Sequence, residues 1–133
     1  MSVEAALQKA VSAIPECLAG GVSDISTGML LGVKTVDSHP AEVLDLVAAA
    51  TADLYQGANV TMIENTFKKV RGVESDEHYF QDILVTSANL LHVFLRSKQN
   101  QDHVVTFVCR GSANMGMVMS KARASMPEIE AAL

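Results

Sequence analysis

Two neighbouring segments that are apolar at both alternating sets of positions constrain this chain most. Residues 90–97 and 103–110 are rich in β-branched and aromatic side chains, and the polar residues 98–102 between them suit a hairpin loop. The alternation places on one face Leu91, Val93, Leu95, Val105, Phe107 and Cys109, and on the other His92, Phe94, Arg96, Val104, Thr106 and Val108. Because a sheet face left in water should be polar, this sheet needs cover on both faces, from helices or from a partner chain.

Helical spacing elsewhere predicts the covering segments. Residues 2–14 form a helix capped by Ser2 and ended before Pro15. Residues 40–71 predict one long amphipathic helix with a break or kink near Gly57. Ser38 or His39 is its expected cap, and Pro40 takes its first position. Its apolar stripe comprises Val43, Leu44, Val47, Thr51, Leu54 and Tyr55. Residues 113–133 predict a last helix capped by Asn114, with Pro127 restarting a short turn.

Three further segments read as strands. Residues 17–25 and 29–36 predict a glycine-containing, closely packed hairpin, and Tyr79 to Thr86 predicts a third strand before the two described above. The expected fold class is α/β, with a five-stranded antiparallel sheet between helices in the order α-β-β-α-β-β-β-α. A chain of 133 residues fits one domain.

Charge and composition argue against several classes of protein. The net charge of -5 and pI near 5.2 disfavour nucleic-acid binding, and Lys68, Lys69 and Arg71 are best explained as complementing a helix dipole. No stretch approaches the ~20 apolar residues of a membrane span, and the N-terminal segment does not resemble a signal peptide. Cys17 and Cys109 lie in apolar runs, so we expect buried free thiols and a cytoplasmic protein.

No constellation of side chains indicates chemistry. The histidines, His39, His78, His92 and His103, do not converge, and residues Glu74, Asp76, Glu77 and Asp82 are typical of a solvated loop entering an edge strand. The turn at 111–116 lacks the Lys and Ser/Thr of a phosphate-binding loop. Since no nucleophile, base and orienting group occur together, we expect no enzyme, catalytic residue, metal or cofactor.

Two parts of the sequence resemble the roadblock/dynein light chain domain family. Residues 19–24 with 28–31 are similar to its first hairpin, and residues 104–108 with 113–118 to its final strand and entry to the last helix. The resemblance implies a single roadblock-like domain over residues 1–133 that forms a homodimer by pairing of the middle strands, and non-catalytic binding of a small Ras-like GTPase. The expected dimer interface comprises Tyr79, Gln81, Ile83 and Val85, and the expected partner-facing helix carries Glu42, Asp45 and Asp53.

The sequence departs from the roadblock family in one segment, and one alternative function is also consistent with the predicted fold. The segment from Gly57 to Asp76 is longer than the family's minimal form, so an extended second helix would alter the platform offered to a GTPase. The alternative is a sensory or ligand-binding domain of profilin-like plan, because one fold can serve several functions. That alternative predicts an internal pocket with convergent polar groups.

Overall fold

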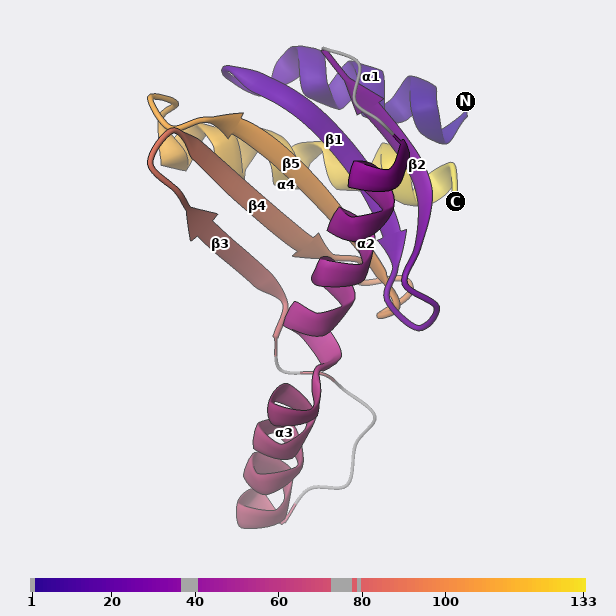
Figure 1. Cartoon of the computed structure of the whole chain (residues 1–133), viewed down its shortest axis with the longest axis vertical. Helices are drawn as coiled ribbons and strands as arrows, with labels where there is room; N and C mark the ends of the chain where they lie inside the picture. The colour runs from indigo at the N-terminus through magenta and orange to yellow at the C-terminus, as the bar shows by residue number, and fades with distance from the viewer. Residues whose placement is uncertain (1, 37–40, 73–77, 79) are drawn as a thin grey trace.

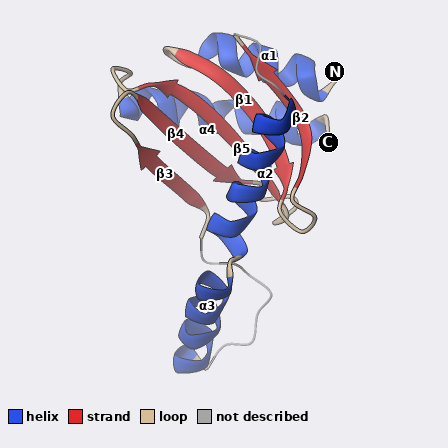
Figure 2. Cartoon of the chain, viewed as in Figure 1, coloured by secondary structure: helices blue, strands red, loops and turns tan. Residues whose placement is uncertain are grey.

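The computed structural model describes residues 2–36, 41–72, 78 and 80–133, and leaves the side chains of residues 41–48 undescribed. Figures 1 and 2 show one sheet with helices on both faces and a helix that projects from one end. The elements are α1 (Val3–Ala13), β1 (Cys17–Asp24), β2 (Met29–Thr35), α2 (Ala41–Gln56), α3 (Ala58–Arg71), β3 (Asp82–Thr86), β4 (Leu90–Arg96), β5 (His103–Arg110) and α4 (Met115–Ala131).

The five strands are antiparallel and lie in the spatial order β2-β1-β5-β4-β3. The predicted register of the last hairpin is confirmed, with His92 opposite Val108. Two predicted helix caps are also confirmed. The Ser2 hydroxyl accepts from the Ala5 N–H at 3.1 Å, and the Asn114 side chain accepts from the Met117 N–H at 3.0 Å.

The larger core lies between the sheet and the pair α1 and α4 (Figure 2). Gly20 in β1 allows close approach, because a Cβ there would lie 3.0 Å from the Phe107 ring and 3.1 Å from Val11. Burial of large apolar side chains here stabilises the fold by roughly 1.5–3 kcal/mol each. The largest of them are Leu7, Val22, Val93, Leu95, Val105, Phe107, Val118 and Ile129.

A smaller core lies under α2, on the opposite face of the sheet, and is formed by Ile25, Tyr55, Phe94 and Val104. Thr51 and Tyr55 point inward from α2, as predicted, but Leu54 is 38% exposed and was wrongly placed in the buried stripe. Leu54 lies within about 60° of Thr51, three residues before it, but is rotated about 100° from Tyr55 in the opposite sense. The sheet faces Thr51 and Tyr55, which leaves Leu54 at the side of the helix.

The expected break near Gly57 separates α2 from α3, so the segment is two helices. Gly57 has φ -58° and ψ 160°, and a Cβ there would lie 2.7 Å from the Asp53 carbonyl oxygen. A side chain at this joint is therefore excluded without a backbone shift. The predicted cap residues 38–40 lie outside the described residues.

Two element boundaries differ from prediction. The third strand begins at Asp82 and not at Tyr79, since Phe80 and Ile83 both pack on the core under α2 although a strict strand would place them on opposite faces. Also, α4 continues through Pro127 and does not restart there. Pro127 is exposed, so water can bond the carbonyl that its ring leaves unpaired, while Met126 and Ile129 beside it stay buried.

Candidate interaction surface

The sheet has an open edge at β3. This strand pairs with β4 on one side, and the structure places no described strand on its other side. Leu84 and Val85 are each 39% exposed. Asp82 lies at the start of the strand, and its carboxylate accepts a hydrogen bond from Arg123 of α4 at 2.7 Å. An edge with free backbone groups and exposed apolar side chains is a template for pairing with another chain.

The predicted interface residues on this edge differ in how far they are exposed to solvent. Tyr79 is outside the described residues. Gln81 precedes β3 and is exposed, while its carbonyl accepts from the Tyr55 hydroxyl at 2.7 Å and from the Arg96 N–H at 3.1 Å. Ile83 is half-buried against the core under α2, whereas Val85 is exposed.

The acidic helix face is described in part. Glu42 and Asp45 belong to α2, but their side chains lie outside the described part of the chain. Asp53 is exposed and lines a groove of about 430 Å³ at the joint between α2 and α3. The groove is lined by Asp53, Leu54, Gly57, Ala58, Asn59, Val60, Phe80 and Ile83.

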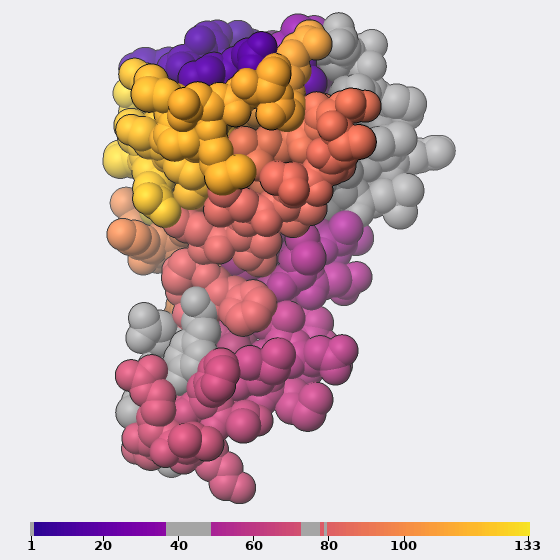
Figure 3. Space-filling view, turned by 90° about the vertical axis from the view of Figure 1, so that its left-hand side faces the viewer, coloured from indigo at the N-terminus to yellow at the C-terminus, as the bar shows by residue number. Residues whose placement is uncertain are grey.

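This groove connects the helix joint to the edge strand, and β3, α2 and α3 adjoin one another on the face shown in Figure 3. Sequence reasoning missed Leu54 and Phe80 as lining residues. Periodicity did not reveal the exposure of Leu54, since it lies three residues after Thr51 and therefore falls in the same apolar stripe. Nothing local to Phe80 indicates the groove, because its walls come from segments far apart in the chain.

Buried charges lie near the base of α3. Glu64 is 3% exposed, and its carboxylate lies 3.3 Å from Nδ1 of His78. Arg96 is also 3% exposed, and its guanidinium lies 4.7 Å over the centre of the Tyr55 ring. Burial lowers the pKa of Arg96 and raises that of Tyr55. The contact between Glu64 and His78 ties α3 to the segment that leads into β3.

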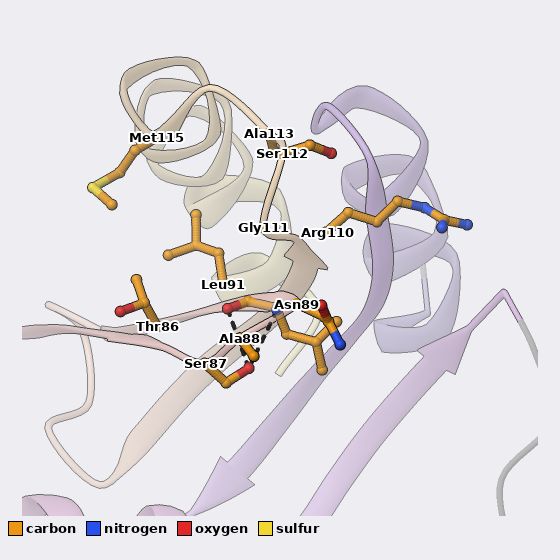
Figure 4. Close-up of a pocket in the computed structure, with 11 residues that line it drawn as sticks. Thr86, Ser87, Ala88, Asn89, Leu91, Arg110, Gly111, Ser112, Ala113 and Met115 are labelled. Carbon is orange, nitrogen blue, oxygen red and sulfur yellow. Dashed lines mark hydrogen bonds between the residues drawn. The ribbon is translucent and has the colours of Figure 1, made fainter.

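A pocket of about 510 Å³ lies between the β3–β4 turn and the β5–α4 turn (Figure 4). Two of its polar groups already serve those turns. The Ser87 hydroxyl accepts from the Leu90 N–H at 3.2 Å, and the Asn89 carbonyl accepts from the Gly111 N–H at 2.8 Å. These two groups are therefore not free to bind a ligand, as the ligand-binding alternative would require of the polar groups in its pocket.

The remaining candidates for chemistry lie apart from one another. Cys17 and Cys109 are buried free thiols on adjacent strands, as predicted, and their hydrogen bond together with burial raises the pKa of Cys109. Among the described residues, no three His, Cys, Asp or Glu side chains are grouped to hold a metal. Glu74, Asp76, Glu77 and His39 lie outside the described part. No described helix is both long and apolar enough to cross a membrane.

Comparison with known proteins gives similarity in structure alone. No family model and no curated protein matches the chain. A Roadblock/LC7 domain from Streptomyces avermitilis superposes with a TM-score of 0.70 at 12% identity, covering 98% of this chain and 97% of that one. A structure described as MglB with tetrameric arrangement gives 0.68 at 16% identity, covering 97% and 88%.

The profilin-like plan is represented too. Profilin II from Acanthamoeba castellanii gives a TM-score of 0.60 at 8% identity, covering 99% of this chain and 100% of that one. TM-scores of 0.60 to 0.70 establish the fold, but at identities of 8–16% they do not establish the function, which must be argued from the site. The predicted fold class is confirmed, and the resemblance to the roadblock family is confirmed at the level of the fold: this chain has the roadblock fold.

Proposed function

We propose that this chain is a non-catalytic interaction module that forms a homodimer through β3 and, as a dimer, binds and regulates a small Ras-like GTPase. In this proposal residues 1–133 act as one domain. The observation that carries it is the open edge of β3, where Leu84 and Val85 are exposed beside the helix that carries Asp53.

Pairing of two β3 edges satisfies the physical demands of that surface. Antiparallel pairing about a two-fold axis supplies partners for the free N–H and C=O groups and joins the two sheets. It also covers Val85, whose side chain is on the same face as Ile83. The tetrameric arrangement of the MglB structure supports association between copies as a property compatible with this fold.

The GTPase part rests on the family resemblance and on charge. The sequence places Glu42, Asp45 and Asp53 on α2, and the chain as a whole has a net charge of -5. An acidic helix face steers association toward a basic surface and selects against acidic ones. We therefore expect the GTPase to present Lys or Arg side chains to α2.

A single substitution with a matched control tests the self-association. Val85→Lys adds a charge to the β3 edge, and Leu31→Lys does the same on β2, at the opposite edge of the sheet, where Leu31 is also 39% exposed. Because a lysine on an edge opposes strand pairing, we expect Val85→Lys to weaken the dimer at least ~10-fold and Leu31→Lys to leave it intact. Sedimentation velocity on the full chain measures both, and a monomeric wild-type chain at micromolar concentration would contradict the proposal.

The GTPase is tested by titration with purified small GTPases from the same organism, each loaded with GDP or a non-hydrolysable GTP analogue. We expect binding that depends on the bound nucleotide and that Asp53→Lys weakens about 10-fold, through loss of charge attraction. Thr27→Lys, which adds a positive charge at the exposed β1–β2 turn, is the control. Absence of binding by every such GTPase would count against this half of the proposal.

A further inference from the structure

Cys17 and Cys109 lie directly opposite each other on two neighbouring inner strands of the sheet. Cys17 begins β1, Cys109 is the last residue but one of β5, and the two are register partners. The two strands run side by side in Figure 1. Both side chains belong to the larger core between the sheet and the helices α1 and α4, so they point to the same face. The proposed function leaves this pair of thiols without a role.

The backbone places the two thiols within reach of a disulfide bond. The Arg110 N–H donates to the Glu16 carbonyl at 3.1 Å, which makes residues 16 and 110 a hydrogen-bonded pair of the antiparallel ladder. Because hydrogen-bonded and non-hydrogen-bonded pairs alternate, Cys17 and Cys109 form a non-hydrogen-bonded pair, in which Cα atoms lie about 4.5 Å apart. A disulfide bond requires Cα atoms roughly 4.4–6.8 Å apart. A register shift directly after Cys17 adds a place where the backbone can adjust.

The two thiols differ in exposure and in acidity. Cys17 is 8% exposed, whereas Cys109 is fully buried. The hydrogen bond from the Cys109 thiol lowers the pKa of Cys17 although burial opposes it, while the same hydrogen bond and burial raise the pKa of Cys109. Since the thiolate is the nucleophile, Cys17 is the thiol that reacts first, and Cys109 is placed to resolve the product.

We propose that Cys17 and Cys109 form a reversible dithiol–disulfide site that is oxidised by hydrogen peroxide. The Cys17 thiolate attacks one peroxide oxygen, the O–O bond breaks, and the leaving hydroxide takes up the proton that Cys17 released. Cys17 is then a sulfenic acid. The Cys109 sulfur attacks the Cys17 sulfur, the S–O bond breaks, and the hydroxyl group leaves as water with the Cys109 proton. Two thiols are oxidised to one disulfide, and one peroxide is reduced to two waters.

Burial selects small molecules as the oxidant and the reductant. Because Cys109 is fully buried in an apolar core, both reagents meet the pair at Cys17. A small thiol reverses the reaction by attacking the Cys17 sulfur, which releases Cys109 and leaves a mixed disulfide on Cys17. A second thiol molecule then releases Cys17, so two small thiols are oxidised to one disulfide.

The disulfide bond joins the start of β1 to the end of β5. Glu16 already connects the turns beside these strand ends, since its carboxylate accepts from the Ser112 hydroxyl at 2.8 Å. A bond between residues 17 and 109 closes most of the chain into a loop, and closing a long loop restricts the unfolded chain strongly. We therefore expect the oxidised chain to unfold at least ~5 °C above the reduced chain. The site is separate from the proposed dimer edge, because β4 lies between β5 and β3.

Titration of the reduced full chain with hydrogen peroxide tests the site. The chain contains two cysteines, so every sulfur product can be counted. We expect intact mass spectrometry to show the loss of two hydrogen atoms, and alkylation of the denatured chain to find no free thiol. Peptide mapping without reductant should join the peptides of Cys17 and Cys109. Dithiothreitol should restore both thiols and return the unfolding midpoint, measured by calorimetry, to that of the reduced chain.

A matched pair of single variants tests the order of the two steps. In Cys109→Ala, Cys17 lacks its resolving partner, so we expect a sulfenic acid that dimedone traps. In Cys17→Ala, Cys109 should react with peroxide at least ~10-fold more slowly than Cys17 does in Cys109→Ala. Circular dichroism verifies that both variants are folded, and equal rates would overturn the role of Cys17 as the attacking thiol.

Three results on the wild-type chain would overturn the site itself. The first is that both thiols stay open to alkylation after a peroxide treatment that oxidises free cysteine. The second is oxidation of Cys17 to a sulfinic acid with no cross-link to Cys109. The third is a disulfide bond that joins two copies of the chain. Since none of these results needs a variant, a variant that fails to fold leaves the test intact.

Discussion

At the scale of single residues, Tyr55 organises the face of the sheet under α2. Its side chain is fully buried, its hydroxyl donates to the Gln81 carbonyl at 2.7 Å, and its ring lies under the Arg96 guanidinium. One aromatic side chain therefore fixes the approach to β3 and shields a buried cation. The core under α2 is small, so the loss of one such contact matters more there than in the larger core.

Tyr55→Phe gives a prediction with a pH dependence. At pH 7 we expect the free energy of unfolding to fall by about 1 kcal/mol, since one buried hydrogen bond is lost. Burial raises the pKa of Tyr55, so above pH about 10 the unfolded chain ionises this phenol while the folded chain does not. The wild type should then lose up to about 1.4 kcal/mol per pH unit that the variant keeps.

Urea unfolding between pH 7 and 11 measures this difference. The two stability curves should converge and then cross as the pH rises. Parallel curves over the whole range would show that the folded and unfolded states bind the phenolic proton equally.

At the scale of elements, the joint between α2 and α3 decides how α3 is placed beside the groove. Gly57 ends one helix with an N–H bond to the Asp53 carbonyl at 3.0 Å and begins the next by accepting from the Thr61 N–H at 3.0 Å. The change of direction between them keeps Val60 at the groove. If α2 and α3 formed one continuous helix, the side chain of Val60 would point in a different direction.

Gly57→Ala tests this joint. A Cβ at 2.7 Å from the Asp53 carbonyl forces the backbone to shift, so we expect a loss of about 1–2 kcal/mol in stability and a weaker dimer. Asn59→Ala, at an exposed position of the same joint, should change neither by more than ~0.5 kcal/mol. Thermal unfolding and sedimentation measure the two effects, and an unchanged Gly57→Ala variant would show that the joint adapts freely.

At the scale of the whole molecule, helices cover both sheet faces, and β2 and β3 are the two edge strands of the sheet. The charged pair of Asp82 and Arg123 ties the start of that edge to α4, so β3 is held in place while its outer side stays accessible. The molecule thus combines a closed core with an open edge. That combination suits a module that works by association.

Self-association makes thermal stability depend on concentration. If two folded copies bind each other and unfolded chains do not, the unfolding midpoint of the wild type should rise with protein concentration. We expect Val85→Lys to show a midpoint independent of concentration and Leu31→Lys to behave as wild type. Differential scanning calorimetry over a hundredfold dilution series measures this, and a concentration-independent wild type would speak against a dimer coupled to folding.

Patterns within short stretches of this chain were sufficient to predict much of the fold. The alternation along residues 90–97 and 103–110 predicted both sheet faces and their register, and Ser2 and Asn114 identified two helix starts. These features depend on backbone geometry and on hydrogen bonds between residues a few positions apart. The same local reasoning placed Asp53 on the polar side of its helix, whereas Val85 was assigned to an interface only through the family resemblance.

Contacts between distant segments set the rest. Whether Leu54 is buried depends on which side of α2 meets the sheet, and the start of β3 depends on how Phe80 packs in the core beneath that helix. The groove exists because α2, α3 and β3 converge, although their residues are separated by tens of positions. Periodicity specifies which side chains share a face, and three-dimensional packing determines what that face meets.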